Sequence, residues 1–265
     1  MTETLSAASS THANSPRSIA ISARSLRKTF RNVVAVDTVS FDLERGSTIA
    51  LLGGNGAGKT TTIGMIMGLI LPTSGSVSVL GADMARERHR VLGRMNFESP
   101  YVDMPHRLTV RQNLKVFGGL YGVGDVAARI AELAESLALA DFLDRQAGRL
   151  SAGQKTRVAL AKALINEPEV LLLDEPTASL DPDTADWVRT YLEAYRARTG
   201  ATILLASHNM AEVERLCERV IIMKRGRIED DDTPAKLLAR YGRTNLEEVF
   251  LHIARGRQAA LEPVS

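Results

Sequence analysis

The residues best suited to chemistry are 53–60, which read Gly-Gly-Asn-Gly-Ala-Gly-Lys-Thr and follow the apolar run 48–52. Only glycine lets a phosphate chain approach the backbone closely, and the N–H groups at the start of the next helix attract anions. Lys59 supplies a charge for the β- and γ-phosphates, and Thr60 supplies a hydroxyl for Mg²⁺. The pattern G-x-x-x-x-G-K-[ST] after a buried strand predicts a phosphate site rather than a plain glycine-rich turn. The expected contacts are Gly53, Asn55, Gly56, Ala57, Gly58, Lys59, Thr60 and Thr61.

Two carboxylates follow another apolar run. Residues 170–173 read Val-Leu-Leu-Leu, which is typical of a strand buried on both faces, and Asp174 and Glu175 come next. Ligands of open α/β sheets bind at the carboxyl ends of the strands. We expect Asp174 to hold Mg²⁺ through water, and Glu175 to accept a proton from a water that attacks the γ-phosphate. Alone, the pair would fit an acidic turn equally well; beside a phosphate loop it favours hydrolysis.

A second candidate anion site lies between these two motifs. Residues 150–155 read Leu-Ser-Ala-Gly-Gln-Lys, and a helical stretch follows to 164. Such a small, polar start leaves backbone N–H groups free at the helix N-terminus, where anions bind. As a bare pattern it is more often an ordinary helix cap. As a site, it would serve either another ligand or a nucleotide bound by a partner.

The bulk composition limits the class of protein. The chain has 265 residues, of which 45% are apolar, so it suits one large domain with a subdomain. A net charge of +2 argues against nucleic acid as a partner. Cys217 is the single cysteine, and its helical apolar spacing predicts a buried thiol. No run of eighteen apolar residues occurs, so we expect no membrane span.

Strand and helix patterns alternate along most of the chain. A helix is expected from the phosphate loop to the breakers at 71–75, and another ends at Gly200. From about 105 to 150 only helical spacing occurs, with a break at 122–124. This alternation predicts an α/β fold with a mostly parallel sheet and a helical insertion. The expected strands are 19–22, 35–43, 48–52, 76–80, 170–173, 202–206 and a hairpin at 220–228, and C-terminal helices are expected at about 233–255.

The motifs in this order resemble the nucleotide-binding subunit of an ATP-binding-cassette (ABC) transporter. The resemblance implies a RecA-like P-loop NTPase core with an antiparallel β subdomain, ATP and Mg²⁺ as cofactors, and one ATPase domain at 19–256. It leaves residues 1–18 as a disordered leader and 257–265 as a flexible tail. The segments that carry it are the phosphate loop, the signature at Leu150–Gln154, Asp174–Glu175, the D-loop at Ser179–Asp181 and Ser207–His208.

The resemblance also implies roles that spacing alone does not give. Phe30 would stack on adenine, although a strand-end core residue is the alternative. Ser151 and Gly153 would contact the γ-phosphate held by a second copy of the chain, or by a paired cassette, in a head-to-tail dimer. His208 would contact the γ-phosphate of its own subunit, and Asp181 would link the two subunits. The residues of the signature segment and the D-loop that the resemblance implies as nucleotide contacts are Ser151, Gly153, Gln154 and Asp181.

The chain departs from the family pattern at two places. Ala152 stands where glycine is usual, and one methyl group leaves the anion site plausible. The segment 95–101 lacks the usual glutamine, which reaches Mg²⁺ and the attacking water. Glu98 is the better match, with Ser99 as the alternative, and Glu98 is therefore a candidate metal ligand that would add negative charge beside ATP.

A cassette of this kind implies an integral membrane permease as its partner and a cytoplasmic location on the inner face of the cell membrane. An apolar groove for a short permease helix could be formed by Tyr101, Val102, Phe117 and Tyr121; equally, these residues could fill the core of the insertion. The ending Asn245–Leu251 resembles subunits of two-component (ABC-2 type) exporters, which favours export over import.

Other classes stay open from the sequence. A non-transport ABC protein of translation or DNA repair usually has two cassettes or long coiled-coil insertions, which this chain lacks. An inactive cassette that only binds ATP is disfavoured by the intact Lys59, Asp174, Glu175 and His208, whereas Glu98 leaves a little room for it. The transported cargo is selected by the permease and cannot be read from this chain.

Overall fold

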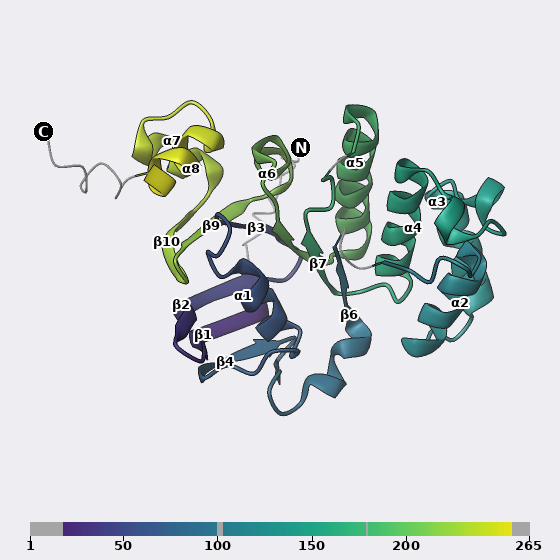
Figure 1. The fold of residues 1–265 in the computed structure, drawn as a ribbon, viewed down its shortest axis with the longest axis horizontal. Helices are drawn as coiled ribbons and strands as arrows, with labels where there is room; N and C mark the ends of the chain where they lie inside the picture. Colours follow the sequence, from purple (N-terminus) through teal and green to yellow (C-terminus); the bar gives the residue numbers. More distant parts are fainter. Residues whose placement is uncertain (1–17, 100–102, 179, 256–265) are drawn as a thin grey trace, which may run out of the picture.

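The computed structural model describes residues 18–99, 103–178 and 180–255, which form two β-sheets with helices around them (Figure 1). Tyr101, Val102, Ser179, the expected tail at 257–265 and all of the expected leader except Ser18 lie outside these residues. The strands are β1 (Ile19–Phe30), β2 (Val33–Glu44), β3 (Thr48–Leu52), β4 (Ser74–Val79), β5 (Ala82–Asp83), β6 (Met95–Glu98), β7 (Val170–Asp174), β8 (Thr202–Ala206), β9 (Arg219–Lys224) and β10 (Arg227–Asp232). The α-helices are α1 (Lys59–Ile66), α2 (Val110–Leu120), α3 (Val126–Ser136), α4 (Ala152–Leu164), α5 (Pro182–Thr199), α6 (Met210–Leu216), α7 (Pro234–Tyr241) and α8 (Leu246–Arg255).

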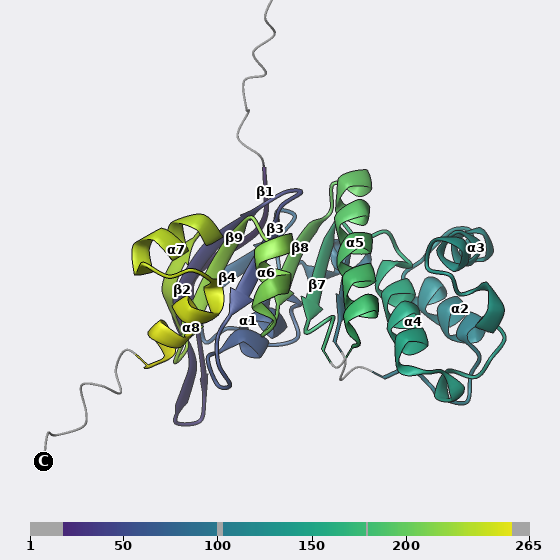
Figure 2. The same ribbon diagram turned by 90° about the horizontal axis from the view of Figure 1, so that it is seen from above.

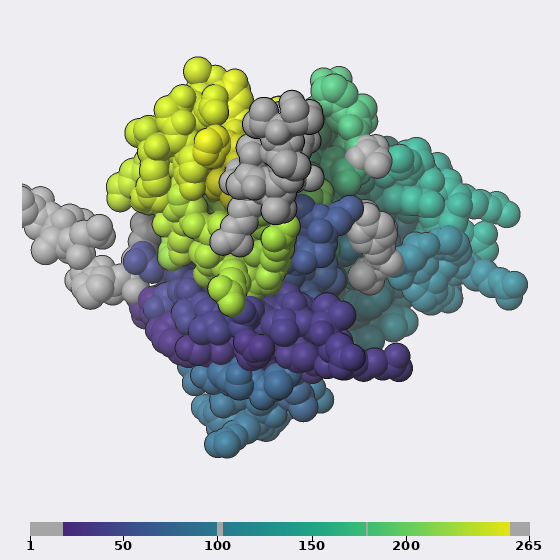
Figure 3. All heavy atoms as spheres, turned by 60° about the vertical axis from the view of Figure 1, so that its left-hand side comes forward, coloured from purple at the N-terminus to yellow at the C-terminus, as the bar shows by residue number. Residues whose placement is uncertain are grey.

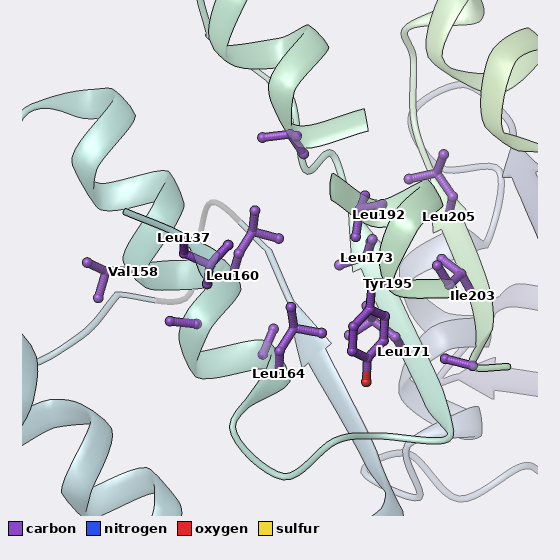
Figure 4. Close-up of a cluster of buried hydrophobic side chains, with 14 of the residues drawn as sticks. Leu137, Val158, Leu160, Leu164, Leu171, Leu173, Leu192, Tyr195, Ile203 and Leu205 are labelled. Atoms are coloured by element: carbon purple, nitrogen blue, oxygen red, sulfur yellow. The ribbon is translucent and has the colours of Figure 1, made fainter. Parts of the chain in front are cut away.

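The larger sheet has the strand order β10-β9-β3-β8-β7-β6. Its five strands from β9 to β6 are parallel, and β10 joins the edge as the antiparallel half of a hairpin. This confirms the predicted α/β fold with a mostly parallel sheet. Both faces of the sheet are buried: Leu171 and Leu173 pack with Leu192 and Tyr195 of α5 (Figure 4), whereas Leu172 faces the other core cluster. Continuous apolar strands are what burial on both faces requires.

The smaller sheet is antiparallel and has the order β2-β1-β4-β5. Figure 1 shows α1 between this sheet and the larger one, and its Ile63 shares a core cluster with Val36 and Leu51. The prediction for the end of α1 was wrong, because the helix stops at Ile66 rather than near Leu71. Gly68 adopts φ +67°, and the N–H groups of residues 69 and 70 both bond the Gly64 carbonyl, which closes the helix early.

Residues 105–150 contain α2 and α3 but no strand longer than a single bridge, and α4 packs beside them (Figure 2). The buried Arg129 guanidinium of α3 donates to the carbonyls of Leu164 at 2.6 Å and Ile165 at 3.3 Å, which fastens the insertion to the end of α4. Phe117 and Tyr121 are partly buried against the core cluster of this region. This placement favours the core alternative over an open groove for these two residues.

The C-terminal helices α7 and α8 lie beside the β9–β10 hairpin, which contacts the phosphate loop. Helix α7 begins after the cap Thr233 with Pro234 at its first position, and Gly242 ends it at φ +60°. Figure 3 shows α7, α8 and the β9–β10 hairpin above β1 and β2 on one face of the molecule. Lys224 Nζ donates to the Ile253 carbonyl of α8 at 2.5 Å. Helix α8 is therefore held beside the hairpin that supports the loop.

Candidate functional site

The phosphate loop joins the buried strand β3 to helix α1, as predicted. Gly58 precedes the helix with φ +105°, and a Cβ atom there would lie 2.7 Å from the carbonyl oxygen of Ala35. A Cβ at Gly53 would likewise lie 2.7 Å from both the Ala57 Cβ and the Met223 carbonyl oxygen. The Ala57 carbonyl accepts a hydrogen bond of 2.9 Å from the Gly226 N–H in the β9–β10 turn. These close approaches explain why the loop needs glycine at 53 and 58.

The loop lines a cavity of about 410 Å³ together with Val33, Val34 and Ala35 of β2; its other walls are residues 54–61. Lys59 Nζ donates to the Gly53 carbonyl at 2.5 Å and lies 3.4 Å from the Gly54 carbonyl. Burial lowers the pKa of Lys59, while the charges of Glu175 and Asp174 oppose that shift. Lys59 thus lines a cradle that has the chemistry of a phosphate site.

Phe30 ends β1 opposite Val33, which lines this cavity. Its side chain is 46% exposed, and Lys28 Nζ lies 4.9 Å from the centre of its ring. The alternative of a buried strand-end residue is therefore wrong. A half-exposed aromatic ring beside a phosphate cradle is available to stack on a base.

The predicted chemical residues follow three adjacent parallel strands. Strand β8 lies between β3 and β7, so the phosphate loop, Ser207–His208 and Asp174–Glu175 all leave the sheet at its carboxyl edge. Glu175 Oε1 lies 3.3 Å from Nε2 of His208, and its Oε2 accepts a hydrogen bond of 3.2 Å from the His208 backbone N–H. Burial raises the pKa of Asp174, while Lys59 and His208 oppose that shift.

Glu175 has an unusual backbone conformation. Its φ is +54°, a left-handed value that costs a non-glycine residue of order 1–3 kcal/mol. Its N–H donates to the Ala206 carbonyl at 2.7 Å, which ties it to the end of β8. This conformation and the two contacts with His208 hold the carboxylate at the edge of the sheet, where a general base would be needed.

Sequence reasoning missed one residue that holds Ser207, the neighbour of His208. The Glu212 side chain is completely buried, and its Oε2 accepts a hydrogen bond of 2.5 Å from the Ser207 hydroxyl. Burial raises the pKa of Glu212, and its hydrogen bond with Ser207 opposes that shift. A glutamate in an amphipathic helix usually faces solvent, so nothing in the local pattern revealed this contact.

The signature segment forms a helix cap in this chain. Ser151 caps α4: its hydroxyl accepts from the Gln154 N–H at 3.3 Å, and the Gln154 side chain accepts from the Ser151 N–H at 3.1 Å. The segment is largely exposed, and β7 separates α4 from α1 in both Figure 1 and Figure 2. The structure therefore does not bring Ser151, Gly153 or Gln154 to the phosphate loop of the same chain.

Asp181 has a comparable capping role at the start of α5. Its carboxylate accepts from the Thr184 N–H at 3.0 Å and from the Thr184 hydroxyl at 2.7 Å. A Cβ atom at Gly153 would be within 3.5 Å of the same threonine hydroxyl, so the starts of α4 and α5 are neighbours. Asp181 and the signature segment thus share one exposed surface.

The expectation that Glu98 reaches Mg²⁺ disagrees with its placement. Glu98 ends β6 and is buried, and its Oε2 lies 2.6 Å from Nζ of Lys162 in α4. Burial raises the pKa of Glu98 to about 7, while the charge of Lys162 opposes the shift. The carboxylate is held by the ammonium of Lys162, on the side of β6 that faces α4.

The remaining donors fit Mg²⁺. Thr60 contributes a hydroxyl and Asp174 a carboxylate, which are hard oxygen ligands of the kind that Mg²⁺ takes alongside substrate phosphates and water. Within residues 18–99, 103–178 and 180–255 there is no cluster of three or more His, Cys, Asp or Glu side chains that would form a cage from protein alone.

Comparison with known proteins identifies the family. The family model described as ABC transporter matches residues 36–178. The chain is 38% identical over 217 residues to the Nod factor export ATP-binding protein I of Burkholderia lata, covering 81% of this chain and 71% of that protein. It is 34% identical over 234 residues to the protein of the same name from Rhizobium sp. strain N33, covering 88% and 77%.

Solved structures agree with this assignment. An ATP-binding subunit of an ABC transporter superimposes with a TM-score of 0.81 at 26% identity, covering 89% of this chain and 99% of that one. CbiO1 from Clostridium perfringens, part of the CbiONQ transporter complex, gives 0.75 at 26% identity and covers 91% and 98%. In the part of the chain that the structure describes, every helix is too short or too polar to cross a membrane. The chain belongs to the ABC transporter family, as one of its ATP-binding subunits.

Proposed function

We propose that this chain hydrolyses MgATP and that the hydrolysis drives export through a separate membrane permease. The observation that carries the hydrolytic part is the shared carboxyl edge of β3, β8 and β7. There the phosphate loop with Lys59 lies at the same edge as Asp174 and Glu175, and Glu175 contacts His208. A phosphate cradle, a candidate base and a polar partner for that base therefore meet at one place.

Each residue has a role that its geometry supports. The Lys59 ammonium and the N–H groups of the loop would bind the β- and γ-phosphates, and Phe30 would stack on the base. Glu175 would take a proton from the attacking water, while His208 orients the Glu175 carboxylate and reaches towards the γ-phosphate. Thr60 and Asp174 would hold Mg²⁺, which supplies charge neutralisation for the phosphates when bound. Most of the rate enhancement would come from positioning and electrostatic stabilisation.

The second phosphate contact requires another copy of the chain or a paired cassette. Ser151 and Gly153 lie on an exposed helix start that β7 separates from the phosphate loop of the same chain. Free N–H groups at such a start bind anions. We therefore propose a head-to-tail dimer in which Ser151 of one subunit contacts the ATP of the other, with Asp181 on the same surface.

Export is favoured over import by the relatives, which are named for export of Nod factor. We propose the same direction for this chain, with the permease anchoring it at the inner face of the membrane. Phe117 and Tyr121 are partly buried against the core of the insertion. The surface that docks on the permease would therefore be formed mainly by other residues. The cargo of the relatives is not carried over.

Two variants test the hydrolytic site. Lys59→Ala removes the only side-chain cation that lines the described phosphate cavity, and we expect the affinity for a fluorescent ATP analogue to fall at least tenfold. Glu175→Gln keeps the size of the side chain and removes the base. It should bind the analogue within about threefold of the wild type and lose at least 100-fold in steady-state ATPase rate, within the range that general bases contribute.

The outcomes separate the two assignments. Unchanged nucleotide affinity in Lys59→Ala would contradict the phosphate site. A normal ATPase rate in Glu175→Gln would contradict the base. In the wild type, a rate per chain that rises with protein concentration is expected from the dimer, whereas a constant rate over a 100-fold concentration range would rule out pairing of identical chains as a requirement for hydrolysis.

A further inference from the structure

A buried ion pair connects the larger sheet to the signature helix. Glu98 at the end of β6 and Lys162 of α4 lie 2.6 Å apart, and their side chains are only 9% and 5% exposed. Charges removed from water are costly unless they are paired. Neither residue lines the phosphate cavity. The pair therefore needs an explanation that the nucleotide site does not provide.

Three elements meet around this pair. Nζ of Lys162 lies 5.8 Å from the ring centre of Phe117 in α2. Asn96 lies two residues before Glu98 on β6. Its side-chain amide donates to the Lys162 carbonyl at 3.3 Å and accepts from the Tyr121 hydroxyl at 3.0 Å. Helices α2 and α4 are thus fastened to β6 by polar contacts as well as by apolar packing.

The pair holds α4 at a point far from the helix start that carries Ser151. Ser151 caps the N-terminus of α4, and Lys162 lies eleven residues further along the same helix. At 1.5 Å per residue, about 16 Å of continuous helix separates the two. The other partner of the pair, Glu98, lies on β6, and β6 is paired with β7, the strand that carries Asp174. The angle of α4 against the sheet therefore decides where Ser151 stands relative to the catalytic edge.

We propose that the Glu98–Lys162 pair is a positioning pair that fixes the orientation of α4 against the sheet, so that Ser151 is held ready for the nucleotide of the second subunit. This inference rests on the proposed dimeric function. Apolar contacts are non-directional and permit a helix to slide or rotate, whereas one buried ion pair has a single favourable geometry. Glu98 thus acts on the reaction through α4 and does not itself ligate Mg²⁺.

Three variants separate positioning from mere stability. Lys162→Met leaves a buried carboxylate without its partner, and its urea midpoint should fall. Glu98→Leu/Lys162→Met replaces the pair with apolar groups of similar size, which typically restores stability. As the matched control, Glu169→Gln removes an exposed carboxylate that pairs with Arg94, near the opposite end of β6 and β7.

The measurements are the urea midpoint, the affinity for a fluorescent ATP analogue at low protein concentration, and the ATPase rate at saturating ATP and high protein concentration. We expect the Glu98→Leu/Lys162→Met variant to unfold at or above the wild-type midpoint and to bind the analogue within twofold. Its maximal rate should be at least tenfold lower. Glu169→Gln should keep a rate within twofold of the wild type.

A Glu98→Leu/Lys162→Met variant that hydrolyses ATP within twofold of the wild-type rate would overturn the proposal. So would a loss of analogue affinity as large as the loss of rate, because it would place the defect in the phosphate site itself. Failure of the proposed function is visible separately, since the wild type would then show no hydrolysis, or a rate per chain that does not rise with protein concentration.

Discussion

Replacing Gly58 with alanine tests whether the phosphate loop is built by close backbone approach. In the structure Gly58 has φ +105°, and the new Cβ would lie 2.7 Å from the Ala35 carbonyl oxygen and 3.3 Å from Cε of Met223. A left-handed conformation costs alanine about 1–2 kcal/mol. Overpacking against backbone costs roughly another 1–3 kcal/mol. The expected total is about 2–5 kcal/mol.

The strain can be relieved globally or locally, so two quantities must be measured. The free energy of unfolding comes from urea denaturation, and the nucleotide affinity comes from titration with a fluorescent ATP analogue. If the loop moves away from Ala35, the cost appears as weaker binding, and 2 kcal/mol corresponds to about 30-fold in Kd. The two losses together should reach at least about 2 kcal/mol.

Gly54→Ala is the matched control in the same loop. A Cβ at this position would have no other atom within 4 Å, and its φ is not in the left-handed range. Alanine there reduces the freedom of the unfolded chain, so stability should stay level or rise by up to about 1 kcal/mol. If Gly58→Ala and Gly54→Ala have the same stability and the same affinity, the close approach to Ala35 does not shape the loop.

Two further predictions concern Phe30 and Cys217. Phe30→Ala should weaken ATP binding by about 1–3 kcal/mol, the usual worth of stacking a base on an aromatic ring, without moving the urea midpoint, because the ring is 46% exposed; unchanged affinity in a calorimetric titration would exclude stacking. Cys217 is 6% exposed, and burial raises the pKa of its thiol above the ordinary value. The folded protein should therefore react with iodoacetamide at pH 8 at least tenfold more slowly than the protein in urea, as followed by mass spectrometry; equal rates would show that the thiol is open to solvent.

The sequence was a good guide to the nucleotide edge of the sheet. The phosphate loop, Asp174–Glu175 and His208 each follow a short apolar strand, and parallel strands bring their carboxyl ends together once the sheet forms. Such motifs depend on main-chain geometry encoded within a few residues. The helix cap at Ser151 was local in the same sense, because its partner Gln154 lies three residues further along the chain.

Other features of the site depend on contacts between distant segments. The end of α1 was placed too far along the chain, because Gly68 offers a left-handed closure that the later Pro72 obscured. The positive φ of Glu175 arises from its tie to the end of β8, which a linear pattern does not reveal. Glu212 was unremarkable in sequence until folding buried it against Ser207.

Glu98 shows most clearly what could not be predicted from the sequence, namely the partner of a buried carboxylate. By itself the sequence determined that a carboxylate stands in the segment where the family has a glutamine; the strand β6 that carries this carboxylate was not among the expected strands. Only the tertiary structure decided that the carboxylate lies against the ammonium of Lys162, a residue 64 positions away. The physical reason is that a strand fixes the alternation of its side chains but not their partners, and a buried charge takes whichever opposite charge the packed fold brings within reach.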